Sequence, residues 1–248
     1  MKILFITVGT SALTAQRLWS NLRSTEEKAR RELIEGYQKP KARQLQEDYE
    51  ADNDLFATVL DAHRHWWNHW GSDSDRLATS AEMSSTSLLL ADTKFLAPWD
   101  TKDRLVLLLS DTAECDLAGR INAQLMHDIF CQCECGADFA CGQVACDRVL
   151  LHPVPGMDAI HGFKSLSTEL EELIPKLQTG DVSFSFNITG GFKGAVPSIT
   201  YAAMKPNYLL YYLHETQSAI IDVDFTGRAG FQEKMTVARR YLTPRGVV

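Results

Sequence analysis

The feature that most limits what this chain can fold into is a short apolar run close to its start. Ile3 to Val8 carries β-branched and aromatic side chains almost without a break, and Gly9 ends the run. A strand with so few polar side chains has no face to turn toward water, so it belongs in a parallel sheet that is covered on both sides. The run therefore predicts an α/β fold.

Further runs of this kind follow at intervals that leave room for helices. We expect strands at Arg104–Leu109, Val149–Val154, Val182–Ile188, Tyr208–Leu213 and Ala219–Val223, and helices from about Leu13 and over Ser80–Leu90, Ala118–Phe130, Ser167–Leu177 and Phe192–Met204. Only five residues join the last two strands, which predicts an antiparallel hairpin. The alternation predicts a Rossmann-like open sheet, mainly parallel, with helices on both faces and right-handed crossovers.

The domain organisation is simple, with one long excursion. We expect a single domain over residues 1–225, a helical insertion after the first strand at about 24–75, and a short C-terminal extension at 226–248. The insertion is highly charged from Ser24 to about Asp54 and then rich in tryptophan and histidine up to Trp70. Such a segment fits a lid or a dimer arm.

Charge and hydropathy exclude several classes of function. The formal net charge of −7 argues against binding long nucleic acid, which needs a broad basic surface, but it does not exclude a small anion in one cleft. The N-terminal apolar run is too short for a signal peptide, and no later run approaches the length of a membrane span. We therefore expect a cytoplasmic protein with no membrane partner.

The cysteines leave two interpretations open. Five of the six lie at positions 131, 133, 135, 141 and 146. Thiolates favour tetrahedral zinc, which makes Cys131, Cys133, Cys135 and Cys141 weak candidates for a metal site. The C-x-C-x-C spacing lacks the paired C-x₂-C knuckles of common zinc sites, so buried thiols explain the cluster comparably well.

Three predicted strands end in small polar residues that lead into a helix. They are followed by Gly9-Thr10-Ser11, by Ser110-Asp111-Thr112, and by Asn187-Ile188-Thr189-Gly190-Gly191-Phe192-Lys193. Ligands of open α/β sheets bind outside the carboxyl ends of the strands, and helix N-termini favour anions. Gly190 and Gly191 would let the backbone approach a phosphate, and the Lys193 ammonium would reach the same phosphate.

Each segment also has a purely structural interpretation. Ser11 or Thr112 would cap a helix, and the two glycines would serve only a tight turn. Lys193 fits this interpretation least, because a lysine in the first turn of a helix opposes the helix dipole unless an anion is bound there. Three such ends at one sheet edge favour a phosphate pocket.

The run Asn187-Ile188-Thr189-Gly190-Gly191-Phe192-Lys193-Gly194-Ala195-Val196-Pro197 closely resembles the signature of CRISPR-associated Rossmann-fold (CARF) domains. The nearest branch holds the type III CRISPR accessory ribonucleases and the standalone ring nucleases. Thr7–Ser11, Ser110–Thr112 and Tyr212–Glu215 fit the same pattern. The resemblance spans roughly residues 1–15 and 80–225, and within and between these ranges the cysteine cluster and the insertion have no counterpart in the family.

The resemblance implies a homodimer that binds a cyclic oligoadenylate, most often the tetramer, across its two-fold axis. It also implies slow cleavage without a metal or other cofactor, which leaves a 2′,3′-cyclic phosphate and switches off type III CRISPR signalling. Lys193 would stabilise charge on the phosphate, and Ser11 would hold the phosphate or the ribose in line for attack. The ligand-binding residues would be Gly9, Thr10, Ser110, Asp111, Thr112, Asn187, Thr189, Gly190, Gly191 and Phe192.

Other functions stay open on sequence alone. A sensor that binds the ring without cutting it would use the same pocket. Arg64 and His69 match the R-x₄-H pattern of the accessory ribonucleases, which would make the chain a ring-activated ribonuclease, although a histidine-rich segment produces this pattern easily. Trp66, Trp67 or His69 would alternatively stack on adenine if the insertion closes over the ligand.

The ring-activated ribonuclease and a fourth alternative, a dinucleotide-binding enzyme, are disfavoured by what the sequence lacks. About 25 residues follow the last predicted strand, too few for the winged-helix or helical ribonuclease domain that CARF domains often carry. An ordinary dinucleotide-binding enzyme is disfavoured because Gly9-Thr10-Ser11 lacks the G-x-G-x-x-G fingerprint. Ring cleavage is therefore the function that we expect.

Overall fold

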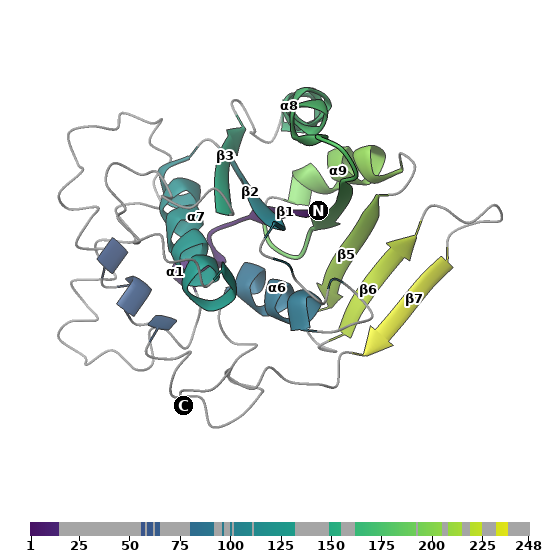
Figure 1. The fold of residues 1–248 in the computed structure, drawn as a ribbon. Coiled ribbons are helices and arrows are strands. Elements are labelled where there is room, and N and C mark those ends of the chain that lie inside the picture. Colours follow the sequence, from purple (N-terminus) through teal and green to yellow (C-terminus); the bar gives the residue numbers. More distant parts are fainter. Residues whose placement is uncertain are drawn as a thin grey trace.

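The computed structural model describes residues 1–14, 56–57, 59–61, 63–64, 80–91, 96, 100, 102–110, 112–131, 149–154, 162–191, 193–204, 208–214, 219–224 and 232–237. Within these residues, seven strands form one sheet (Figure 1). The strands are β1 (Lys2–Val8), β2 (Arg104–Ser110), β3 (Val149–Val154), β4 (Ser183–Asn187), β5 (Leu209–His214), β6 (Ala219–Asp224) and β7 (Gln232–Val237). The helices are α1 (Ser11–Thr14), α6 (Ala81–Ala91), α7 (Ala113–Met126), α8 (Gly162–Leu177) and α9 (Val196–Ala203), with a π-helical turn at His127–Cys131 and a 3₁₀ turn at Lys193–Ala195.

The order of the strands in the sheet is β3-β2-β1-β4-β5-β6-β7. The first five pair in parallel, β6 pairs antiparallel with β5, and β7 pairs antiparallel with β6. From β1 the chain proceeds outward through β2 and β3, and it then returns to β4 on the other side of β1. The connections after β1 and β4 therefore lead to opposite sides of the sheet, which makes the carboxyl ends of these two strands the topological switch point, where open α/β sheets bind their ligands.

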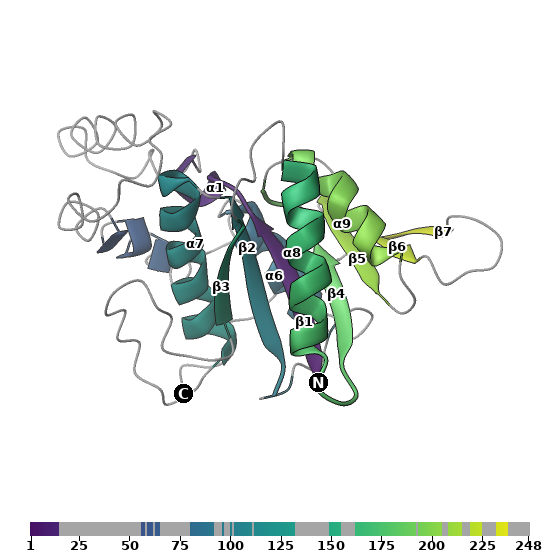
Figure 2. The same cartoon turned by 90° about the horizontal axis from the view of Figure 1, so that it is seen from above.

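Helices cover both faces of the sheet, as Figure 2 shows from above. Side chains of β1 alternate between two buried clusters. Leu4, Ile6 and Val8 pack in a cluster with residues of α6 and α7, whereas Ile3 and Phe5 pack in a second cluster with residues of α8 and α9. The predicted Rossmann-like sheet, with helices on both faces and a C-terminal antiparallel pair, is confirmed.

Three predicted helices differ from the structure in their bounds. The helix expected over Ser167–Leu177 begins earlier, at Gly162. The helix expected from Ala118 begins at Ala113, because the Thr112 side chain caps it, and it ends in the π-helical turn. The helix expected over Phe192–Met204 is split into the 3₁₀ turn and α9. Pro197 lies in the first turn of α9, where a missing amide proton costs no hydrogen bond. Lys193 therefore precedes the α-helix instead of lying in its first turn.

The C-terminal extension contains a strand that the sequence analysis did not predict. β7 has the sequence QEKMTV, which is too polar to stand out as a strand. It forms an edge of the sheet, and charged side chains are common on edge strands because they discourage pairing with other chains.

Part of the predicted insertion packs against the main sheet. Val59 and Leu60 are buried in the same cluster as Leu4 and Ile6. His63 Nε2 lies 2.8 Å from the carbonyl oxygen of Ala12, so it donates a hydrogen bond to α1. The remainder of the insertion lies outside the described residues. In the part of the chain that the structure describes, we find no helix long and apolar enough to cross a membrane.

Candidate functional site

The turns after β1 and β4 touch at the carboxyl edge of the sheet. The Thr7 hydroxyl donates a 2.5 Å hydrogen bond to the carbonyl oxygen of Gly190. Gly191 has a φ of +88°, and a Cβ added to it would lie 2.7 Å from the Cβ of Thr7. A Cβ on Gly9 would lie 3.0 Å from the nitrogen of Gly191. The sequence therefore needs glycine at these positions so that two backbones can meet.

The side chain of Asn187, the last residue of β4, holds the turn that follows β4 in place. It is only 1% exposed, and its Nδ2 donates to the hydroxyl oxygens of Ser85 at 2.7 Å and Thr86 at 3.2 Å on α6. Its Oδ1 accepts from both the amide and the hydroxyl of Thr189. The amide of Leu213 in β5 donates to the Thr189 hydroxyl at 2.9 Å. The two residues thus join the β4 turn to α6 and β5.

A buried carboxylate, Glu82, lies under the point where the two turns meet. Its Oε1 accepts a 2.8 Å hydrogen bond from the amide of Gly9, and its Oε2 accepts from the hydroxyl of Ser11. The amide of Ala81 donates to the Ser11 oxygen at 3.0 Å. A Cβ on Gly190 would lie 2.2 Å from Glu82 Oε1, so the glycine makes room for the carboxylate. Glu82 therefore connects both turns to the start of α6.

Burial raises the pKa of Glu82 above its usual value of 4.5, and hydrogen bonds from Gly9, Ser11, its own amide and Ser80 partly offset this effect. The side chain is 0% exposed. Sequence reasoning missed this residue. A signal was present, because Glu82 is the one charged residue in a helix of small and apolar side chains, AEMSSTSLLLA.

The end of β2 contributes a buried serine and a helix cap. Leu109 pairs with Val8 in β1, so Ser110 lies beside the β1 turn, and its side chain is 7% exposed. The Thr112 hydroxyl oxygen accepts from the amide of Cys115 at 3.3 Å and so caps α7. Asp111 lies outside the described residues.

Lys193 follows Gly191 by two positions and is exposed. In the described part of the chain, neither a hydrogen bond nor an ion pair involves its ammonium group. Thr10 is also exposed. Phe192 lies outside the described residues. The structure thus brings Gly9, Ser11, Gly190 and Gly191 together and places an exposed cation directly after them.

Two further sets of sequence candidates are the ribonuclease-like motif and the cysteine cluster, and of these the structure describes the side chain of Arg64. Arg64 forms an ion pair with Asp128 in the π-helical turn, with Nη2 at 2.6 Å and Nε at 2.9 Å from the same carboxylate oxygen. His69, Trp66 and Trp67 lie outside the described residues. So do Cys133, Cys135 and Cys141 and the side chain of Cys131, and the described residues contain no cluster of metal-binding side chains.

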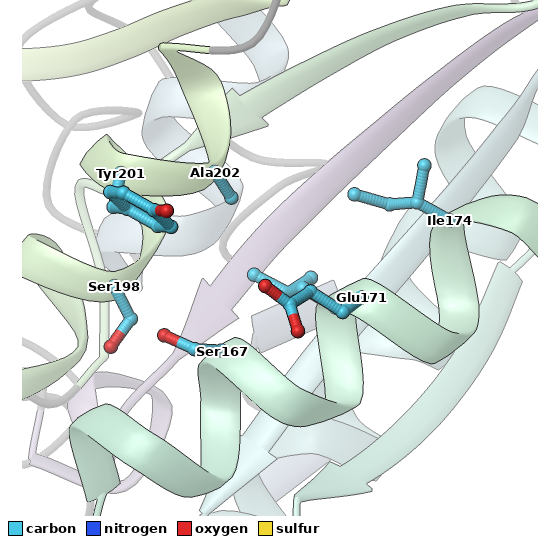
Figure 3. Close-up of a pocket in the computed structure, with 7 residues that line it drawn as sticks. Ser167, Glu171, Ile174, Ser198, Tyr201 and Ala202 are labelled. Atoms are coloured by element: carbon cyan, nitrogen blue, oxygen red, sulfur yellow. The ribbon is translucent and has the colours of Figure 1, made fainter.

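A shallow hollow lies between α8 and α9, on the face of the sheet opposite α6 (Figure 3). Its lining residues are Ser167, Leu170, Glu171, Ile174, Ser198, Tyr201 and Ala202. The hydroxyl group of Ser167 points toward Ser198 in Figure 3. Glu171 is the one charged side chain in this set, so the hollow is a poor site for a phosphate.

The topology and the junction of the two turns define an α/β domain of Rossmann-like type, a fold whose ligands bind at the switch point. Residues 78–223 match the model of the CRISPR-associated protein family Cas_APE2256. The chain belongs to this family, which is a CARF family. No match was found among curated proteins. The matched range includes Glu82 and the whole β4 turn, whereas Gly9, Thr10 and Ser11 precede it.

Proposed function

We propose that the chain binds a cyclic oligoadenylate, and specifically cyclic tetra-adenylate, between two copies of itself and cleaves it without a metal ion. One observation carries the proposal: the β1 and β4 turns meet at the switch point, and the exposed Lys193 follows directly. Membership of a CRISPR-associated family supports a signalling nucleotide as the ligand.

The proposed reaction is an internal transesterification. A ribose 2′-oxygen forms a bond to the neighbouring phosphorus, the bond from phosphorus to the 5′-oxygen breaks, and the 2′-proton leaves while the 5′-oxygen gains one from solvent. The product carries a 2′,3′-cyclic phosphate and a 5′-hydroxyl. Such a reaction needs in-line placement and stabilisation of the charge on the phosphate. Ser11 and the turn residues would supply the placement, and the Lys193 ammonium would supply the charge.

A dimer would suit this ligand because the ring has a two-fold axis of its own. Two copies related by the same axis present identical turns to opposite phosphates. Residues that the ring would touch in each copy are Thr10 and Ser11, the turn amides at Gly190 and Gly191, and Lys193. Asn187 and Thr189 would act by holding the second turn in shape.

The experiment is digestion of labelled cyclic tetra-adenylate by the purified chain in excess chelator. We expect linear di-adenylate with a 2′,3′-cyclic phosphate. The Lys193→Ala variant should lose about 100-fold in rate, a typical effect of removing one group that stabilises transition-state charge. Lys176→Ala is the matched control, because Lys176 is also an exposed lysine. It lies in the last turn of α8, near the start of β4 and therefore at the sheet edge opposite the proposed site.

Each outcome has a definite meaning. An intact ring that still binds tightly would reduce the chain to a sensor. An intact ring that does not bind would overturn the proposal. Equal rates for the two lysine variants would remove Lys193 from the reaction. Activated cutting of a generic single-stranded RNA, lost in His69→Ala, would favour the ribonuclease instead.

A further inference from the structure

The hydroxyl group of Ser11 has a defined hydrogen-bond direction. A serine hydroxyl has one proton to donate and two lone pairs with which to accept. Ser11 donates its proton to Glu82 Oε2, and its oxygen accepts from the amide of Ala81 at 3.0 Å. One lone pair remains on the oxygen of this partly exposed side chain. A ligand that reaches Ser11 therefore meets a hydrogen-bond acceptor there and no proton from this hydroxyl.

The position of Glu82 keeps the Ser11 proton directed toward its carboxylate. The side chain is 0% exposed, and its second oxygen accepts from the amide of Gly9 at 2.8 Å. The backbone of Gly190 closes over that oxygen, and no side chain larger than hydrogen fits there. An ionised carboxylate only accepts hydrogen bonds, so it imposes the direction of the bond on Ser11.

We propose that Glu82 is a positioning residue that draws the Ser11 proton inward, so that Ser11 Oγ accepts a hydrogen bond from a ribose 2′-OH of the ligand instead of donating one to a phosphate. The inference rests on the proposed function and assigns Ser11 to one of its two possible roles. Phosphodiester oxygens carry no proton near neutral pH and would meet the Ser11 lone pair unfavourably. A 2′-OH has a proton to donate, and this contact would orient the attacking oxygen.

The direction of the bond depends on the charge of Glu82. The described groups that donate hydrogen bonds to it are Gly9, Ser11, Ser80 and its own amide, and none of them is charged. Burial raises the pKa of Glu82 above 4.5. Below that pKa the protonated carboxyl would donate to Ser11, and Ser11 would turn its proton outward. Cleavage should therefore increase as the pH rises through the pKa of Glu82.

A binding experiment tests the contact with the 2′-OH directly. The dissociation constants of cyclic tetra-adenylate and of its all-2′-deoxy analogue are measured for wild type and Ser11→Ala, in titrations completed before cleavage. Loss of one hydrogen bond should weaken binding of the ribose ring by about 5- to 10-fold and leave binding of the deoxy ring unchanged. Equal weakening for both rings would mean that Ser11 contacts the phosphate, and the inference would be wrong.

A kinetic experiment tests Glu82 itself. In Glu82→Gln the amide oxygen still accepts from Gly9, whereas the NH₂ group donates to Ser11 and reverses the bond. We expect the turnover rate to fall by about 100-fold, because the attacking oxygen loses its alignment, and the dissociation constant to rise by no more than the roughly 5- to 10-fold expected for Ser11→Ala. The low-pH decline of wild type should be absent in this variant. Glu171→Gln, an exposed site on α8, is the matched control.

A double variant shows whether Glu82 acts through Ser11. Glu82→Gln combined with Ser11→Ala should be no slower than Ser11→Ala alone, because the carboxylate then has no hydroxyl to orient. Additive losses, or a Glu82→Gln variant as fast as wild type, would overturn the inference while wild-type cleavage still stands. Wild type that neither binds nor cleaves the ring would instead overturn the proposed function. If Glu82→Gln does not fold, the comparison of ribose and deoxy rings decides alone.

Discussion

Gly9 and Gly191 stand so close across the two turns that a Cβ on Gly9 would lie 3.0 Å from the Gly191 nitrogen. Neither turn can therefore change shape without moving the other. The pair makes a single rigid junction from segments that lie about 180 residues apart in the chain, as does the hydrogen bond from Thr7 to Gly190, which spans 183 positions.

The first prediction concerns the space at Gly191. In Gly191→Ala the new methyl group would lie 2.7 Å from the Thr7 Cβ, in addition to the strain of a φ of +88°. Gly180→Ala is a matched control, because Gly180 has a φ of +81° but nothing within 4 Å of a Cβ. We expect Gly191→Ala to lower the free energy of unfolding by about 1–3 kcal/mol more than the control does. Urea denaturation measures the difference, and equal losses would show that the turns have room to separate.

The second prediction concerns the side chain beneath the β4 turn. Asn187→Leu keeps the approximate volume but leaves the Ser85, Thr86 and Thr189 hydroxyls without their bonds to this amide. We expect a loss of about 2–4 kcal/mol in the free energy of unfolding, since buried polar groups that lose partners are costly. Ser183→Ala, at an exposed position of the same strand, should change it by less than about 0.5 kcal/mol. A small loss in Asn187→Leu would mean that these hydroxyls find other partners.

The sequence was sufficient to predict most of the sheet, because a strand that is buried on both faces is a continuous apolar run that can be recognised locally. Every residue from Leu105 to Leu109 is apolar and buried, so β2 is visible without any knowledge of its neighbours. The polar strand β7 contains no such run, since it is stabilised by its pairing with β6 rather than by its own composition.

The candidate site was predictable only where its residues are neighbours in the chain. The motif from Asn187 to Lys193 and the turn from Gly9 to Ser11 could each be recognised locally. For Glu82 the sequence shows only a lone charge in an otherwise uncharged helix, and its role depends on contacts with residues more than 70 positions away. A glutamate near the start of a helix has an ordinary explanation in the helix dipole, and that explanation hides the contact.

The third prediction separates a helix cap from a ligand contact at Thr112. In Thr112→Ala the amide of Cys115 loses its side-chain acceptor, which should cost about 1 kcal/mol in the free energy of unfolding. Thr112→Ser keeps the hydroxyl and should recover most of this loss. The rate of ring cleavage should be the same in both variants. A rate reduced more than about 10-fold in Thr112→Ala alone, a difference of about 1.4 kcal/mol in barrier, would indicate that the hydroxyl touches the ligand.

The last prediction concerns the pH dependence of stability through His63, whose ring is buried and donates to the carbonyl oxygen of Ala12. Burial lowers the pKa of His63 below 6.5, and the hydrogen bond to Ala12 offsets part of this effect. The folded chain then binds fewer protons than the unfolded chain in the window between the lowered pKa and 6.5. The contribution of the neutral ring to the free energy of unfolding is therefore fully present above pH 6.5 and is lost as the pH falls through that window.

His63→Gln keeps an N–H donor for Ala12 but does not titrate. The difference in free energy of unfolding between wild type and this variant, measured by urea denaturation from about pH 7.5 down to about pH 5, should shift in favour of the variant as the pH falls. Contributions from Glu82 and other acids are common to both proteins and cancel, so a difference that stays constant with pH would show that His63 is not buried in its neutral form.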